Sequence, residues 1–122
     1  TIHFEGPDAI QVDKEMKRFF AWANKKQDDW VLKAAIAHLW FVTIHPFDDG
    51  NGRIGRAIAD LLLARSEKNA SRFYSLSAQI QAERKEYYRI LEKTQKGGLD
   101  ITDWIEWFIL CFMKAIDKAF AV

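Results

Sequence analysis

A twelve-residue segment, residues 45–56, contains the side chains best suited to chemistry. It runs HPFDDGNGRIGR, which places a histidine, two aspartates, a Gly-Asn-Gly turn and two arginines close together. A histidine can accept a hydroxyl proton near neutral pH. The glycines let the chain turn and expose backbone N–H groups, and arginine forks match phosphate oxygens. The segment therefore predicts a site that binds a metal-bound nucleotide and moves one of its phosphoryl groups.

The predicted phosphate site begins where a helix is expected to start, near residue 52. The first N–H groups of a helix lack intrahelical partners, so with Gly50 and Gly52 they would form an anion cradle. Asn51 can add a side-chain amide to this cradle. Two carboxylates next to it, Asp48 and Asp49, would repel phosphate unless Mg²⁺ lay between the charges. The predicted ligand is thus a magnesium-bound nucleotide.

Simpler interpretations remain open for each part of the segment. His45 could cap the end of a helix, and the aspartate pair could form only a turn. Arg56 could pair with Asp60 one helical turn later. We expect Phe47 to bury its ring and anchor the loop. The nucleotide hypothesis is favoured because one short segment supplies every part of a single mechanism.

Two familiar phosphate motifs do not account for the segment. Residues 50–55 match the Gly-x-Gly-x-x-Gly pattern of dinucleotide-binding folds. That pattern requires a strand on either side of its helix, and nothing after Arg65 resembles the second strand. A P-loop requires Gly-Lys-Ser/Thr, which the sequence lacks.

The elements that must position this segment are predicted to be helices. Periodicity and capping residues place them at residues 9–25, 29–44, 52–66, 77–96 and 101–120, with the fourth kinked or split early. Asp28 or Asp29 can cap the second helix, and Asp100 the last. The fold class is all-α, a bundle of about five to seven helices. At most a remnant β-strand is expected, at residues 1–4.

Two of these helices have informative apolar patterns. In the second, only Lys33 and His38 are strongly polar between residues 31 and 44, which places this helix in the middle of the bundle. The first helix is expected to bury a stripe that includes Phe19 and Phe20. The third is expected to bury a stripe made of Ile54, Ile58, Leu61 and Leu62.

Composition limits the class of protein. The 122 residues fit one domain, and 18 basic against 17 acidic side chains argue against a nucleic-acid-binding surface. The single cysteine, Cys111, cannot form an internal disulfide and is expected to be buried. No apolar run reaches the roughly 20 residues of a membrane span. Cytoplasmic localisation is the default expectation, and export as an effector stays open.

The 45–56 segment resembles the signature of the Fic family. That signature reads His-x-Phe-x-Asp/Glu-Gly-Asn-Gly-Arg-x-x-Arg, and every specified position matches. The helical core, the apolar helix before the motif and a Tyr-Tyr pair after it are similar to Fic domains as well. The resemblance implies a single Fic catalytic core over residues 1–122. It also implies a protein adenylyltransferase, which transfers AMP from ATP to a Tyr, Thr or Ser hydroxyl of a target protein.

The resemblance assigns roles to individual residues. His45 is implied to be the base, Asp49 the Mg²⁺ ligand and Phe47 a buried aromatic anchor. Gly50 to Gly52 would cradle the α- and β-phosphates, and the two arginines would hold the β- and γ-phosphates. The implied nucleotide-binding residues are Asp49, Gly50, Asn51, Gly52, Arg53, Ile54, Gly55, Arg56, Tyr87, Tyr88 and Gln95.

The resemblance also raises questions of docking and control. Fic domains carry a β-hairpin flap that aligns the target, and residues 1–5 resemble only its last strand. Many members are restrained by a helix bearing Ser/Thr-x-x-x-Glu-Gly/Asn. Residues 1–6 fit this pattern, but Gly6-Pro7 would stop a helix there. The inhibitory helix is therefore expected before residue 1 or on an antitoxin-like partner.

Other activities remain open for the same fold. A phosphotransferase like Doc binds ATP reversed, but its motif usually replaces the second glycine with lysine, whereas Gly52 is intact. Removal of AMP from a modified protein is another possibility. An inactive interaction module would also be compatible with a truncated flap.

Overall fold

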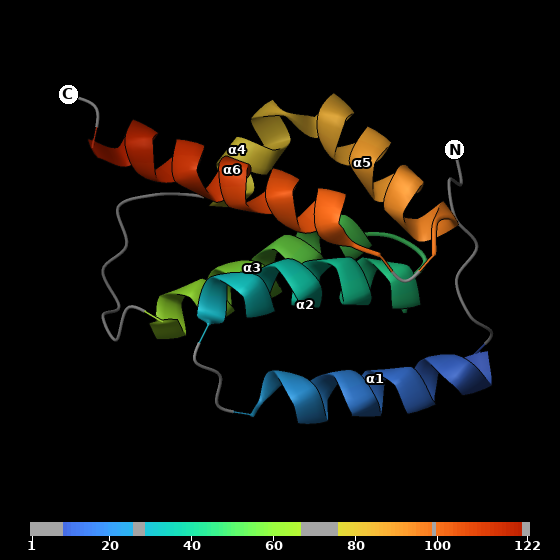
Figure 1. Cartoon of the computed structure of the whole chain (residues 1–122). Helices are drawn as coiled ribbons and strands as arrows, with labels where there is room; N and C mark the ends of the chain where they lie inside the picture. The colour runs from blue at the N-terminus through green and yellow to red at the C-terminus, as the bar shows by residue number, and fades with distance from the viewer. Residues whose placement is uncertain (1–8, 26–28, 67–75, 99, 121–122) are drawn as a thin grey trace.

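The computed structural model describes residues 9–25, 29–66, 76–98 and 100–120, and within these ranges the chain is helical with no strand (Figure 1). The predicted all-α class is confirmed. The predicted strand at residues 1–4 and the Ser/Thr-x-x-x-Glu-Gly pattern at residues 1–6 lie outside the described residues. The helices are α1 (Ala9–Ala23), α2 (Trp30–Ile44), α3 (Asn51–Ser66), α4 (Leu76–Ala82), α5 (Arg84–Lys96) and α6 (Thr102–Phe120).

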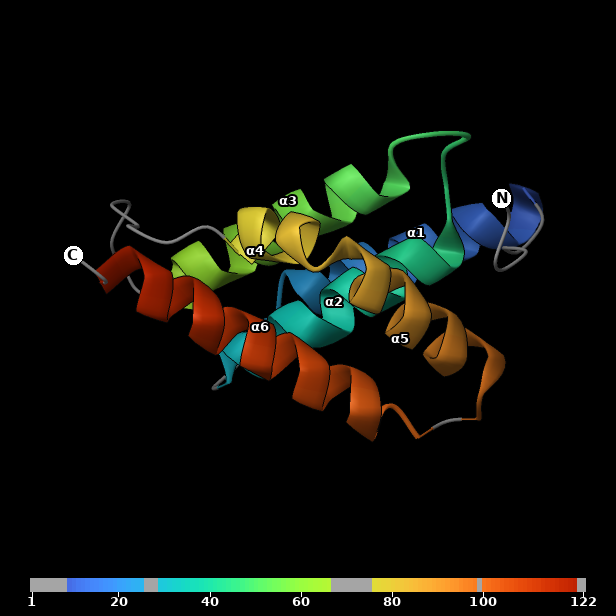
Figure 2. The ribbon, with the colours of Figure 1, turned by 90° about the horizontal axis from the view of Figure 1, so that it is seen from above.

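The helices are arranged around α2 and α3. These two lie side by side in the middle of the molecule and make its most extensive helix–helix contact (Figures 1 and 2). Helix α1 packs on one side of α2 and α6 on another, while α4 packs against α3 and α6, and α5 against α6. The loop that carries the chemical residues connects α2 to α3, so both of its ends are fixed by the best-packed part of the bundle.

Helix α2 is buried because nearly every one of its faces meets another helix. Asp29 caps its start, accepting a hydrogen bond of 2.9 Å from the Leu32 N–H. The buried Lys33 donates from Nζ to the Lys25 carbonyl oxygen at 2.5 Å, and its ammonium lies over the rings of Trp22 and Trp30. Both predictions, the aspartate cap and the central position, are confirmed.

The buried stripe of α3 differs from the predicted one. Ile54 and Leu61 are 37% and 53% exposed. Leu62 is buried and Ile58 packs partly buried against the core, as predicted, while Gly55, Ala59 and Leu63 make up the rest of the inner side of α3. Small residues at its start allow close approach to α2, which outweighs the burial of larger side chains one position earlier. In α1 the stripe includes Phe19, which is buried, but not Phe20, which is 52% exposed.

The predicted fourth helix is split at Glu83, between α4 and α5. The Glu83 N–H is shared between the carbonyl oxygens of Gln79 and Ile80, both at 3.1 Å. Its carboxylate accepts hydrogen bonds from Gln79 Nε2 at 2.6 Å and, across to α6, from Lys114 Nζ at 3.1 Å. The predicted early break is confirmed, and an ion pair with α6 accompanies it.

Helix α6 closes the core. Asp100 caps it as predicted, accepting hydrogen bonds from the Thr102 N–H at 3.0 Å and the Thr102 hydroxyl at 2.5 Å. Trp104 is fully buried, and its Nε1–H donates to the Ala35 carbonyl oxygen of α2 at 2.8 Å. Cys111 is buried, as expected, and burial raises the pKa of its thiol to about 12. No helix among the described residues is long and apolar enough to cross a bilayer.

Candidate active site

His45 lies immediately after α2 in a left-handed backbone conformation. Its φ and ψ are 54° and 58°, and it is the only non-glycine residue with positive φ in the described part of the chain. Its N–H donates to the Phe41 carbonyl oxygen at 3.1 Å, which caps the helix. Glycine is the usual residue at such a cap, because a Cβ is strained there. An exposed histidine at this position suggests that its side chain has a use beyond capping.

Asn51, the first residue of α3, holds the loop in shape. Its Oδ1 accepts a hydrogen bond of 3.0 Å from the Phe47 N–H, and its Nδ2 donates to the Phe47 carbonyl oxygen at 2.7 Å. The same Nδ2 lies 3.4 Å from Nε2 of His45. In the tautomer that carries its proton on Nδ1, Nε2 has a lone pair that can accept from this amide. Asn51 therefore connects the loop, the helix start and the histidine.

The ring of Phe47 is not buried, contrary to the prediction. It is 51% exposed. The prediction assumed that an aromatic ring must anchor the loop, but the two hydrogen bonds between Asn51 and the Phe47 backbone do so instead. Since the loop is fixed through its main chain, the ring is free to face solvent.

The start of α3 has the features of an anion site. Gly50 has a φ of 84°, a conformation that favours glycine, and its carbonyl oxygen accepts the first helical hydrogen bond from the Ile54 N–H at 3.0 Å. The N–H groups of residues 51–53 come before that bond, so they lack partners within the helix. With the positive end of the helix dipole, they favour a bound anion such as phosphate.

Two glycines of α3 differ in what surrounds them. A Cβ at Gly52 would meet only Nη1 of Arg56, at an ordinary 3.5 Å. A Cβ at Gly55 would lie 3.1 Å from Val42 Cγ1 and 3.3 Å from two atoms of the His38 ring. Gly55 is therefore a packing residue against α2, a different role from the predicted nucleotide contact. Gly52 leaves space on the outer side of the helix.

The two arginines lie near this open space. Arg53 is exposed, whereas Arg56 is half-buried. Since Nη1 of Arg56 comes close to Gly52, this side chain folds back along α3 toward the anion site. Its Nε is buried and has no hydrogen-bond partner in the described structure. Arg56 is thus partly fixed while its terminal nitrogens remain near the helix start.

The carboxylates fit a magnesium ion shared with phosphate. Asp48 and Asp49 are both exposed, and Oδ1 of Asp49 accepts a hydrogen bond of 2.9 Å from the Gly50 N–H. This bond fixes the carboxylate next to the anion site and leaves its second oxygen available as a metal ligand. No group of three or more His, Cys, Asp or Glu side chains gathers within the described residues. One carboxylate plus phosphate oxygens is the usual protein contribution to a nucleotide-bound Mg²⁺.

The three predicted residues of α5 have different surroundings. Tyr87 is 2% exposed, and its hydroxyl lies 2.7 Å from Nε2 of His38, so in this structure it is a core residue and not a pocket wall. Tyr88 is 50% exposed and packs against the Tyr87 ring at a centroid distance of 5.1 Å. Gln95 donates from Nε2 to Oγ1 of Thr43 at 3.0 Å, which joins α5 to α2 two residues before His45.

Sequence reasoning assigned no role to His38, which lies under the start of α3. It is fully buried, hydrogen-bonded to Tyr87 and stacked on Trp104 at a centroid distance of 5.6 Å. Burial, and to a lesser degree the charge of Arg56, lowers the pKa of His38 from 6.5 to about 4. A polar residue in an otherwise apolar helix was the available signal, but the sequence did not show what it faced.

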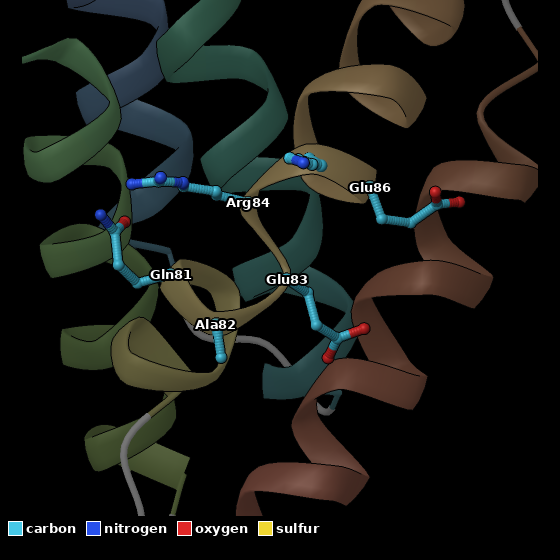
Figure 3. Close-up of a pocket in the computed structure, with 6 residues that line it drawn as sticks. Gln81, Ala82, Glu83, Arg84 and Glu86 are labelled. Carbon is cyan, nitrogen blue, oxygen red and sulfur yellow. The ribbon is translucent and has the colours of Figure 1, made fainter.

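A pocket of about 540 Å³ lies at the junction of α4 and α5, outside the 45–56 segment. Its lining is the continuous segment Gln81 to Glu86 (Figure 3). Glu83 and Glu86 point toward α6, whereas Gln81 and Arg84 point to the opposite side. This pocket therefore does not coincide with the residues that could do chemistry.

The chain is similar to known proteins. Residues 1–63 match the family model described as the Fic/DOC family. Over 105 residues the chain is 34% identical to proteins named "Protein adenylyltransferase Fic" from Drosophila grimshawi and Drosophila mojavensis, and 33% identical to the Drosophila melanogaster protein of that name. Each match covers 84% of this chain but only 19–20% of the relative. The chain thus spans about a fifth of the length of these relatives.

Proposed function

Because this chain belongs to the Fic/DOC family, we propose that it is a protein adenylyltransferase core that transfers AMP from ATP to a hydroxyl of a target protein. One observation carries the proposal. Nε2 of His45 lies 3.4 Å from the side-chain amide of Asn51, the residue that opens α3 and its unpaired N–H groups. A base is therefore held directly beside an anion site. The names of the relatives support the same activity.

The reaction follows from this arrangement. The target hydroxyl loses its proton to Nε2 of His45 as its oxygen attacks the α-phosphorus of ATP. The bond between the α-phosphorus and the bridging oxygen breaks, and pyrophosphate leaves with the bonding electrons. The product is a phosphodiester that joins AMP to the target side chain. The histidine then releases its proton to solvent.

The nucleotide phosphates are assigned to the start of α3. The N–H groups of residues 51–53 and the open side of Gly52 receive the α- and β-phosphates, while Arg53 and Arg56 hold the β- and γ-phosphates. Asp49 would hold the Mg²⁺, which supplies positive charge where negative charge develops on the leaving pyrophosphate. These donors stabilise the leaving group, so the base and the charge act on opposite sides of the α-phosphorus.

Residues outside the phosphate site receive narrower proposals. Tyr88 is the exposed tyrosine of the pair, so it is the one we assign to the side of the pocket near the nucleotide base. Gln95 is assigned indirectly, because it holds Thr43 next to the end of α2. Ile54 contributes through its backbone, which makes the first helical bond. The macromolecular partner is a target protein that presents an accessible hydroxyl.

Labelled ATP tests the proposal. The chain is incubated with Mg²⁺, a cell lysate and ATP labelled on either the α- or the γ-phosphate. We expect protein labelling from the α position only, and its loss in His45→Ala by a factor of about 10² to 10⁴. Labelling from the γ position only would replace AMP transfer by kinase chemistry. ATP binding without any transfer would reduce the chain to a nucleotide-binding module.

Two neighbouring aspartates provide a matched control for the metal. Asp48 and Asp49 are both exposed, but only Asp49 is held by the Gly50 N–H beside the anion site. We expect Asp49→Asn to raise the Mg²⁺ concentration needed for half-maximal transfer by about tenfold or more, and Asp48→Asn to change it by less than about threefold. Equal effects of the two substitutions would contradict the assignment of Asp49.

A further inference from the structure

The outer face of α6 carries the largest group of exposed apolar side chains on any described helix. Ile109, Leu110 and Met113 are 37%, 56% and 54% exposed. Met113 follows Leu110 by three positions and Ile109 by four, so the three side chains adjoin on the helix surface. We call these three residues the α6 patch.

The inner face of α6 is already packed within the chain. Trp104, Phe108 and Cys111 are buried, and the helix contacts α2, α4 and α5. Helix α6 lies at the edge of the molecule, and no described helix lies over its outer face (Figures 1 and 2). A helix that is apolar on both faces is typical of one that packs on both sides. The α6 patch therefore indicates a surface that binds another molecule.

The charges around the α6 patch are complementary to themselves when the helix is reversed. Before the patch, Asp103 and Glu106 are exposed, and after it Lys114 and Lys118 are exposed together with Asp117. The ion pairs that Asp103 and Lys114 make within the chain leave 60% and 56% of these side chains exposed. Two antiparallel copies of α6 would place the acidic half of each helix against the lysines of the other. A parallel pair would set like charges opposite each other.

We propose that two copies of this chain associate through the α6 patch as an antiparallel helix pair, with a twofold axis near Leu110. Such an interface uses the same surface of both copies and closes after two of them. Ile109 of one copy then faces Met113 of the other. A single helix face buries less than the about 800 Å² per partner of a standard interface, so we expect a weak dimer with a Kd on the order of 10⁻⁵ M.

The dimer leaves the candidate active site open. The loop between α2 and α3 lies on the far side of the molecule from α6 (Figure 2). Association through α6 therefore does not cover residues 45–56 of either copy. The proposal stands apart from the proposed function, and its tests measure association alone.

The first test compares two exposed leucines. Leu110 in the α6 patch and Leu61 on α3 are 56% and 53% exposed, so an aspartate at either position perturbs the fold to a similar degree, which circular dichroism checks. Sedimentation equilibrium at increasing concentration should show the wild-type mass rising from that of one chain toward that of two. Leu110→Asp should weaken association at least about tenfold, and Leu61→Asp less than about twofold. A wild-type chain that stays monomeric, or equal losses in the two variants, would overturn the proposal.

Disulfide cross-linking tests the direction of the two helices. Asp103 lies seven positions before Leu110, which is two turns along the same line of α6. In the antiparallel pair, the thiols of Leu110→Cys meet near the twofold axis, whereas those of Asp103→Cys lie about 20 Å apart and cannot join. The native Cys111 is buried and does not compete.

Mild oxidation with copper phenanthroline should therefore give covalent dimers of Leu110→Cys, visible on a non-reducing gel, and none of Asp103→Cys. Cross-linking of both variants would indicate a parallel pair or random collision. Cross-linking of neither would show that the two patches do not meet. Either result would overturn the proposal.

Discussion

The first two turns of α3 have an inner face against α2 and an outer face toward solvent, and one glycine lies on each. Gly55 on the inner face is tightly enclosed by Val42 and His38, whereas Gly52 on the outer face has room for a methyl group. The same residue type therefore serves close helix packing at one position and, in the proposed function, access for a ligand at the other. Within the 45–56 segment, Gly55 therefore has a packing role, and only the other residues of the site are proposed to contact a ligand or take part in the reaction.

This difference shows how the site is built. The inner face fixes the axis of α3 through small residues and the buried His38, so the N–H groups at its start point in a defined direction. The outer face carries Arg53 and the open side of Gly52. Substitutions on the inner face should mainly change stability, and those on the outer face should mainly change ligand binding.

The largest expected effect on this side concerns His38, the α2 residue that packs against the inner face of α3. Its pKa is lowered from 6.5 to about 4, mainly by burial. Between these pH values the unfolded chain binds a proton that the folded chain does not, so the free energy of unfolding falls as pH drops from 6.5 to 4. The full shift corresponds to on the order of 3 kcal/mol. Urea denaturation at several pH values measures this loss.

The His38→Gln variant isolates the histidine from the carboxylates that also titrate in acid. Its amide can still meet the Tyr87 hydroxyl but does not titrate in this range. The variant should be less stable at pH 7 and lose less stability on acidification than the wild-type chain. If both chains lost the same free energy of unfolding between pH 6.5 and 4, His38 would not be the cause of the loss of stability in acid.

The next largest effect is expected at Gly55. A Cβ there is 3.1 Å from Val42 Cγ1 and 3.3 Å from the His38 ring, which Tyr87 and Trp104 hold in place. Gly55→Ala should destabilise the fold by about 1–3 kcal/mol, despite the higher helix propensity of alanine. Thermal unfolding would reveal the loss as a lower Tm. A more stable variant would show that α2 and α3 can separate without cost.

Gly52→Ala should act in the opposite way. The added methyl group makes only an ordinary contact with Arg56, so we expect unchanged or slightly higher stability, by up to about 1 kcal/mol. The methyl group would, however, occupy the space that we propose for phosphate, and ATP affinity should fall about tenfold. Thermal unfolding measures the change in stability, and calorimetric titration measures the change in ATP affinity. Unaltered ATP affinity would contradict the proposal that the phosphates bind on the outer face of α3.

The smallest effect is expected at Phe47, on the loop before the outer face. With its ring 51% exposed, Phe47→Ala should cost about 1 kcal/mol or less, because the backbone bonds to Asn51 persist. The buried Phe19 gives the comparison, and Phe19→Ala should cost about 3–5 kcal/mol. Chemical denaturation measures the free energy of unfolding that each of the two variants loses. Similar losses would restore the predicted role of Phe47 as a buried anchor.

The sequence predicted the helices well because their signals are local. The aspartates before α2 and α6, and the apolar residues of α2, depend only on near neighbours along the chain, and the structure confirms them. The 45–56 segment was found for the same reason, because its parts are contiguous. Its predicted chemistry remains a proposal, since the residue types alone do not measure activity.

Two of the misplaced residues, Ile54 and Tyr87, depended on contacts between helices, whereas Phe47 depended on a local loop contact. Ile54 and Phe47 were expected to be buried because they are large and apolar, but Gly55 provides the closer packing and Asn51 the loop bonds. Tyr87 was grouped with Tyr88 by sequence, although its hydroxyl meets His38, 49 positions away. The periodicity of apolar residues within one helix does not show which residues of another helix it contacts.

The left-handed backbone of His45 sets a limit on engineering. Glycine would relieve the strain at this position, so His45→Gly should stabilise the chain by up to about 1 kcal/mol while removing the proposed base. A screen that selects only for heat resistance would therefore favour loss of function at this residue. Optimisation of this scaffold requires an activity readout at every round.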